Sequence, residues 1–230
     1  MKKQRVCTVK GIPLIKFQSA DRIKSLREGK LYANTLEYYR NLEQDTGDAD
    51  IGDTFEAMLH INEGYLFIPE NEQVSVLNDT LFKTSESDDL VFCMFSVEAD
   101  IEHFQFSEEQ KEKMLSFGDT ALAILDTDEF KKRIFEAAQK ENMEAHFGKV
   151  YYFDESIDGG NLIISLLRGM WNIAFWKRKR YTYQQESRFV FKINGEKKDH
   201  LLLDIGDISD ISKVVSAKTI LDGYVKKGAV

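Results

Sequence analysis

The segment 181–191, Tyr-Thr-Tyr-Gln-Gln-Glu-Ser-Arg-Phe-Val-Phe, carries the side chains best suited to chemistry. Its alternation predicts a strand, and residues two apart on a strand share a face, so we expect Gln184, Glu186 and Arg188 to point the same way. In a cleft, Glu186 could hold a ribose hydroxyl or stabilise a developing cation while Gln184 orients an acceptor. The alternative is an exposed strand face with an ordinary Glu–Arg arrangement, since the pattern Gln-x-Glu is short enough to occur by chance.

Four consecutive basic residues, Lys177, Arg178, Lys179 and Arg180, come directly before that strand. Apolar residues at helical spacing over 161–176 predict a buried helix that ends at this basic run. One interpretation is a solvated helix terminus, where cations are favoured by the helix dipole. The other is a rim that binds phosphate or a nucleic acid, with the neighbouring aromatic residues stacking a base.

Other common site patterns are missing from the sequence. The four histidines are isolated, so no zinc site is predicted. The acidic stretch 45–56 has Asp50 where an EF-hand loop requires glycine, which leaves a solvated turn as its interpretation. Cys93 lies in an apolar run and is expected to be structural. We therefore expect no metal, and no phosphate-binding P-loop, dinucleotide or hydrolase signature occurs.

Composition narrows the class of protein. The chain has 230 residues with Lys+Arg 31 against Asp+Glu 39, a net charge of −8, which disfavours nonspecific binding of nucleic acid and leaves only a local basic patch for it. No apolar run reaches the roughly 18 to 20 residues of a membrane span, and two cysteines make no disulfide framework. We expect a cytoplasmic globular protein that makes no contact with membranes.

The elements that must position these residues follow from periodicity and from start and stop signals. Strands and helices do not alternate strictly and no linker is visible, so we predict one α+β domain over 1–230, with a mixed, largely antiparallel sheet and flanking helices. The run 90–97 is expected to be its central strand. Residues 71–89 are expected to be irregular, with Val74-Ser-Val76 as the one strand candidate among them. The other expected strands are 12–17, 30–34, 55–67 with a turn at 62–64, 121–125, 150–153, 181–193, 201–203, 214–215 and 220–221, and the other expected helices are 19–29, 35–43, 108–117 and 126–142.

Several short motifs, taken in order, resemble a bacterial and phage family linked to abortive-infection proteins of the AbiGi type. The segment Gly52-Asp-Thr-Phe-Glu56 is similar to an "N-D-P-F-E" signature of that family, of which it keeps the Asp, Phe and Glu. The other matching pieces are Ile15-Lys-Phe17, Ile23-Lys-Ser-Leu26, Gly29-Lys-Leu-Tyr-Ala-Asn34, Phe92-Cys-Met-Phe-Ser96 and Lys179-Arg-Tyr-Thr-Tyr-Gln-Gln-Glu-Ser-Arg188.

More remotely, the order of strand, helix, strand, Ser-containing strand and late Gln-x-Glu strand resembles the ADP-ribosyltransferase superfamily, including DarT-like modifiers of nucleic acids. This resemblance implies a split sheet, NAD as the cofactor, Glu186 as the catalytic residue and Gln184 as the residue that orients the acceptor. The family has Arg or His on its first strand, where this chain has Lys16. The cofactor-binding residues implied here are Ser96, Lys16, Tyr32, Tyr38 and Arg188.

Two functions therefore follow as hypotheses. The first is an NAD-dependent ADP-ribosyltransferase-like protein of bacterial or phage conflict that modifies a macromolecule. The second is a noncatalytic phage or host-defence protein that binds and inhibits a protein partner.

Overall fold

The computed structural model describes the chain in two compact units. Unit 1 contains the described residues of 1–35, 90–149 and 183–230, and unit 2 contains those of 36–89 and 150–182. Because the two units alternate along the chain, neither is one continuous stretch of sequence, and the single domain stays a prediction. The described residues are 8–47, 50–68, 71–83, 89–97, 103–154, 172–192, 198–223 and 225–227.

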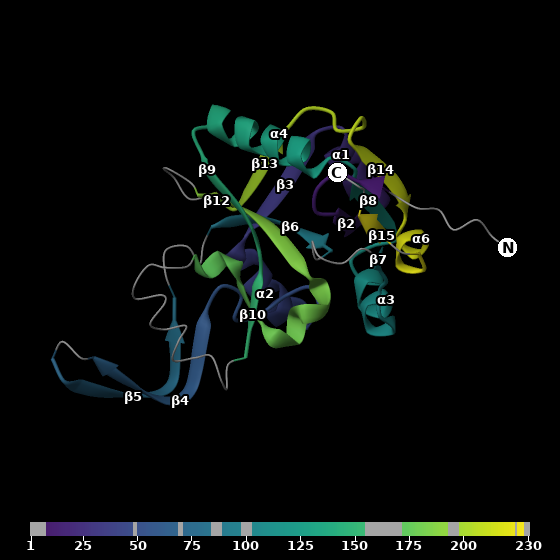
Figure 1. Ribbon diagram of the computed structural model, residues 1–230. Coiled ribbons are helices and arrows are strands. Elements are labelled where there is room, and N and C mark those ends of the chain that lie inside the picture. The colour runs from purple at the N-terminus through teal and green to yellow at the C-terminus, as the bar shows by residue number, and fades with distance from the viewer. Residues whose placement is uncertain are drawn as a thin grey trace. The chain divides into compact units, whose positions relative to one another are not determined.

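Unit 1 is built on an eight-stranded sheet in which every described pairing is antiparallel, which confirms the α+β class (Figure 1). Six strands follow the order β13-β3-β6-β2-β8-β14, while β12 pairs with both β6 and β9. The strands are β2 (Leu14–Gln18), β3 (Lys30–Thr35), β6 (Leu90–Ser96), β8 (Thr120–Ile124), β9 (Glu144–Lys149), β12 (Glu186–Lys192), β13 (His200–Asp204) and β14 (Ser212–Ser216). A smaller sheet joins β1 (Thr8–Val9), β15 (Val225–Lys227) and β7 (His103–Phe104).

The sheet divides beside its central strand. One edge of β6 pairs with β12 over 90–95, whereas the other edge pairs with β3 only over 90–91 and with β2 only over 95–96. The middle of β6 therefore lacks a strand partner on that edge. Lys16 of β2 reaches into this division, where its amine donates to the Cys93 carbonyl at 2.6 Å. We call this place the sheet division.

Three helices of unit 1, α1 (Ala20–Arg27), α3 (Glu108–Leu115) and α4 (Thr127–Lys140), begin within one residue of where the sequence predicts them. The Ser107 hydroxyl and the Gln110 side chain form a capping box at α3, and Asp126 caps α4. Helix α1 ends before Gly29, whose φ of 94° favours glycine. The strand expected at 220–221 is wrong, because these residues lie in α6 (Ala217–Leu221).

Unit 2 contains α2 (Leu36–Thr46), a hairpin of β4 (Leu59–Ile68) and β5 (Gln73–Phe82), and a parallel pair of β10 (Tyr151–Phe153) and β11 (Trp176–Arg178). Figure 1 shows β4 and β5 as a long two-stranded ribbon. The turn expected at 62–64 is wrong, since these residues lie within β4. The strand candidate at 74–76 is confirmed as part of β5, whereas the irregular structure expected for the rest of 73–82 is wrong. Most β5 side chains are exposed on both faces, so apolar alternation is confined to the short stretch around Val74 and Val76.

The helix expected over 161–176 falls mostly outside the described residues. Its last part is a short 3-10 helix, η2 (Ile173–Phe175), followed by β11 and then η3 (Lys179–Gln184). The basic run therefore lies on a strand and a 3-10 helix in the described chain, and a helix terminus is the wrong prediction there. No helix among the described residues has the length and apolar character needed to cross a membrane.

Candidate functional site

Glu186 and Arg188 form an ion pair within one strand. Glu186 is the first residue of β12, and its carboxylate accepts from Arg188 Nε at 2.7 Å, so the two side chains share a face as the alternation predicts. The Glu186 side chain is 10% exposed and that of Arg188 is 1% exposed. Arg188 thus holds the Glu186 carboxylate in one orientation.

Gln184 does not share that face. It ends η3, and the next residue, Gln185, has a φ of 40°, which breaks the strand alternation before β12 begins. Gln184 is buried, and its amide donates to the Tyr183 hydroxyl at 3.3 Å. The common face predicted for Gln184 and Glu186 is therefore wrong, and Gln184 is placed to support its neighbours from within the core.

Ser96 holds the turn that leads into β12. Its hydroxyl donates to the Gln185 carbonyl at 3.0 Å and accepts from the Ser187 hydroxyl at 2.9 Å. Glu186 lies opposite Phe95 in the antiparallel register, so the neighbouring Ser96 points to the other face of the sheet. Ser96 consequently fixes the backbone beside Glu186 and does not share its surface.

Lys16 occupies the sheet division. Besides its bond to Cys93, its amine lies 4.8 Å above the centre of the Phe92 ring. Burial lowers the pKa of Lys16, an effect that the nearby Cys93 and Glu186 oppose and Arg22 reinforces. The charges of Lys16 and Glu186 therefore attract each other at the sheet division.

The two tyrosines proposed as stacking residues lie in different units. Tyr32 on β3 is 47% exposed and stacks on His200, with ring centres 5.3 Å apart. Tyr38 lies on α2 in unit 2 and meets Tyr39 edge-on at 5.4 Å. Because Tyr38 and Glu186 belong to different units, a role for Tyr38 beside Glu186 stays a prediction.

The basic run is divided between the interior and the surface of unit 2. Lys177 is 4% exposed and its amine lies 3.3 Å from a Glu56 carboxylate oxygen, so Lys177 is no part of a solvent-exposed rim. Lys179 and Arg180 have side chains 67% and 49% exposed. Lys177 therefore does not belong to the predicted rim, whereas Lys179 and Arg180 are exposed enough to form it.

Arg178 is held by a buried acid and two rings. Its guanidinium bonds the Asp53 carboxylate and lies 4.8 Å from the centre of the Phe55 ring and 5.8 Å from that of Tyr181. Asp53 is fully buried. Burial raises the pKa of Asp53 and Glu56 adds to this, while Arg178 and Lys177 oppose it. The arrangement fixes Arg178 in one position.

Glu43 ties the next basic residue to the same region. Its carboxylate accepts from the backbone N–H and the hydroxyl of Thr54 at 2.5 and 2.9 Å and from Arg180 at 3.0 Å. Burial alone would raise the pKa of Glu43, but these hydrogen bonds and the Arg180 charge lower it. The Tyr181 hydroxyl donates to the Gly52 carbonyl at 3.0 Å. The segments 52–56 and 177–181, which are far apart in sequence, are therefore interlocked.

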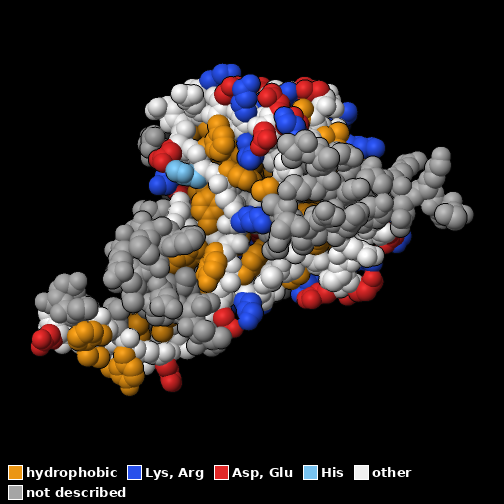
Figure 2. Space-filling model, viewed as in Figure 1, with side chains coloured by type: hydrophobic (Ala, Val, Ile, Leu, Met, Phe, Trp, Pro, Cys, Tyr) orange, Lys and Arg blue, Asp and Glu red, His pale blue; other side chains and the backbone are white. Residues whose placement is uncertain are grey.

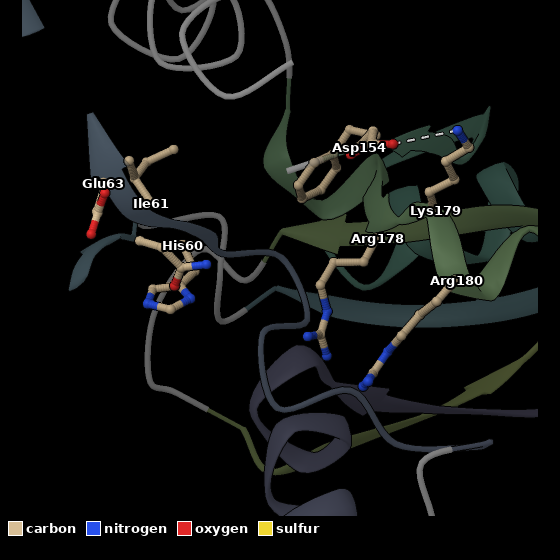
Figure 3. Close-up of a pocket in the computed structure, with 9 residues that line it drawn as sticks. His60, Ile61, Glu63, Asp154, Arg178, Lys179 and Arg180 are labelled. Carbon is tan, nitrogen blue, oxygen red and sulfur yellow. Dashed lines mark hydrogen bonds and ion pairs between the residues drawn. The ribbon is translucent and has the colours of Figure 1, made fainter. Parts of the chain in front are cut away.

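A cavity of about 910 Å³ adjoins this region, with residues of β4 on one side and the basic run on the other (Figure 3). Sequence reasoning missed the β4 side because β4 was expected to turn at 62–64. We call this cavity the β4–β11 pocket. Its lining residues are His60, Ile61, Asn62, Glu63, Phe153, Asp154, Arg178, Lys179 and Arg180.

No family model, curated protein or solved structure matches the chain. Among the residues that the structure describes, no group of three or more His, Cys, Asp or Glu is arranged to hold a metal ion.

Proposed function

We propose that the protein is an NAD-dependent ADP-ribosyltransferase-like enzyme of bacterial or phage conflict that modifies a macromolecule, with Glu186 as its catalytic residue. The observation that supports this proposal is that Arg188 orients the Glu186 carboxylate, whose charge interacts with Lys16 at the sheet division. The resemblance of the sequence around Glu186 to transferases supplies the reaction class. Ser96 does not fit the family role, because it points to the other face.

NAD would supply an ADP-ribosyl group, as the bond between nicotinamide and the ribose carbon breaks and nicotinamide leaves with the electron pair. The Glu186 carboxylate would accept a hydrogen bond from the ribose 2′-hydroxyl and stabilise the positive charge that develops on the sugar. Arg188 would keep Glu186 in position through its 2.7 Å bond. The acceptor atom then bonds the ribose carbon and loses its proton.

Release of nicotinamide by the purified full chain, with bacterial lysate added to supply the macromolecular acceptor, tests the proposal. Glu186→Gln is expected to lower turnover about 100-fold or more, because it removes the charge that stabilises the transition state. Glu108→Gln is the matched control, since Glu108 is 90% exposed on α3 and its substitution should leave turnover unchanged. Thermal unfolding would confirm that both variants are folded. A parent chain that does not consume NAD, or a Glu186→Gln variant as active as the parent, would contradict the proposal.

A noncatalytic role in binding a protein partner is the second candidate, and the β4–β5 hairpin favours it. Tyr65 faces Val76 and Phe67 faces Val74 across the two strands, with all four residues 55% to 78% exposed. Figure 2 shows this apolar surface at the end of the hairpin. Exposed apolar patches mark binding surfaces more often than scattered single residues do.

The two candidates separate in bacterial cells that express the chain and are challenged with phage. A transferase should lose its effect on phage growth with Glu186→Gln and keep it with Tyr65→Ser. A binding protein should show the opposite pattern. Both variants would be checked for equal expression.

A further inference from the structure

We propose that the β4–β11 pocket binds a phosphate ester of nucleotide size, with the phosphate against Lys179 and Arg180. This site lies within unit 2 and does not rest on the proposed transferase activity. Its volume of about 910 Å³ suits a small molecule of that size.

The basic side of the pocket is organised before any ligand binds. Arg178 is fixed by its bond to Asp53 and by the Phe55 ring. Arg180 donates to the Tyr181 hydroxyl at 2.6 Å, and its guanidinium carbon lies 4.8 Å from the centre of that ring. Figure 3 shows the two guanidinium groups pointing the same way, while Lys179 extends toward Asp154. Fixed guanidinium groups lose little freedom when they bind a phosphate.

The outer two cations remain available to a ligand. Lys179 lies 3.4 Å from Asp154 and Arg180 lies 3.0 Å from Glu43, and both basic side chains are about half exposed or more. Exposed ion pairs contribute little to stability, so a phosphate can replace Asp154 at small cost. The dianionic phosphate then gains charge-assisted hydrogen bonds.

The opposite side of the pocket argues against a simple polyanion. Asn62 and Glu63 of β4 line it, and Glu63 brings a carboxylate to this side. Carboxylates repel additional negative charge but accept hydrogen bonds from hydroxyl and amino groups. The chemistry therefore fits a molecule with one phosphate end and one end rich in donors, such as the sugar and base of a nucleotide.

Calorimetry on the full chain at low salt tests this with three probes: adenosine monophosphate, inorganic phosphate and adenosine. We expect adenosine monophosphate to bind at least about tenfold more tightly than either of the others, because it alone contacts both sides of the pocket. Lys179→Gln and Arg180→Gln should each weaken its binding about tenfold through the loss of a charged hydrogen bond. Lys132→Gln is the control, since Lys132 is 62% exposed on α4 in unit 1.

Three results would overturn the proposal. They are no binding of adenosine monophosphate at millimolar concentration, equal binding of it and adenosine, or unchanged binding in both variants. Equal binding of adenosine monophosphate and inorganic phosphate would reject the nucleotide part and reduce the site to an anion site. If Arg180→Gln fails to fold, Lys179→Gln still decides, because Lys179 is mostly exposed and its substitution disturbs no buried contact.

Discussion

Lys177→Met is expected to destabilise the protein strongly although it removes one charge from a strand. The Lys177 and Glu56 side chains are 3% and 2% exposed and their charged atoms lie 3.3 Å apart. Methionine keeps most of the lysine stem, so the substitution removes the charge with little change in packing. The Glu56 carboxylate would then stay buried without the charge of Lys177.

The size of the effect follows from this geometry. Two unit charges 3.3 Å apart attract by about 5 kcal/mol at an effective dielectric constant of about 20. Desolvation offsets part of this in the intact pair, but removing one partner of a buried pair costs about 3 to 5 kcal/mol. The Lys177 amine also lies 4.7 Å from the centre of the Tyr181 ring, a contact of about 1 to 2 kcal/mol that methionine does not replace. A loss of this size is a large part of the total stability of a typical protein.

Urea unfolding at neutral pH, followed by tryptophan fluorescence, measures the change, because the buried Trp176 is the residue before Lys177. The double variant Lys177→Met/Glu56→Gln removes both charges and should recover at least about 2 kcal/mol relative to Lys177→Met. Lys179→Met, at a side chain 67% exposed, is the matched control and should change stability by less than about 0.5 kcal/mol. A loss below about 1 kcal/mol for Lys177→Met, or no recovery in the double variant, would refute the reasoning.

Three further predictions concern single residues. Burial raises the pKa of Asp53 above 3.8, so the folded state holds that proton more tightly than the unfolded state does, and the stability from this group is lost as pH rises above about 4. Asp53→Asn should flatten that loss in thermal unfolding followed across pH. Gly29→Ala should cost at least about 2 kcal/mol in urea unfolding, because a Cβ would collide with the Gly206 backbone, whereas Gly47→Ala, also at positive φ but with open space around it, should cost about 1 kcal/mol. Arg133→Gln should cost about 1 kcal/mol through two partly exposed ion pairs, and the cost should shrink in concentrated salt.

Local signals account for the parts of the fold that the sequence predicts correctly. The capping box at Ser107 and the cap at Asp126 are read from a few neighbouring residues. The almost continuous apolar run 90–96 predicts a strand in the centre of the sheet. In the structure all but one of its side chains are buried. The Glu186–Arg188 pair follows from strand alternation alone.

The failures have equally specific causes. Most side chains on both faces of the hairpin strand β5 are exposed, so apart from Val74 and Val76 its sequence is as polar as that of a loop. Gln184 lies outside the strand because Gln185 has a left-handed backbone conformation. Such a conformation is usually signalled by glycine or asparagine, and the sequence has glutamine at this position. The burial of Lys177 depends on Glu56, more than a hundred residues earlier, and periodicity carries no information about such a pair.

The buried charges of unit 2 require an explanation, because an apolar core of the same volume would be as stable or more so. Asp53 and Glu43 hold Arg178 and Arg180 from behind, and the two guanidinium groups face the same way at the β4–β11 pocket. Hydrogen bonds between guanidinium and carboxylate groups are directional, which adds a geometric specificity that apolar contacts lack. We infer that the interlocked segments 52–56 and 177–181 keep their charges because these set the direction of the arginines. In this interpretation the buried charges orient Arg178 and Arg180 at the pocket, and an apolar core would be at least as stable but would not orient them.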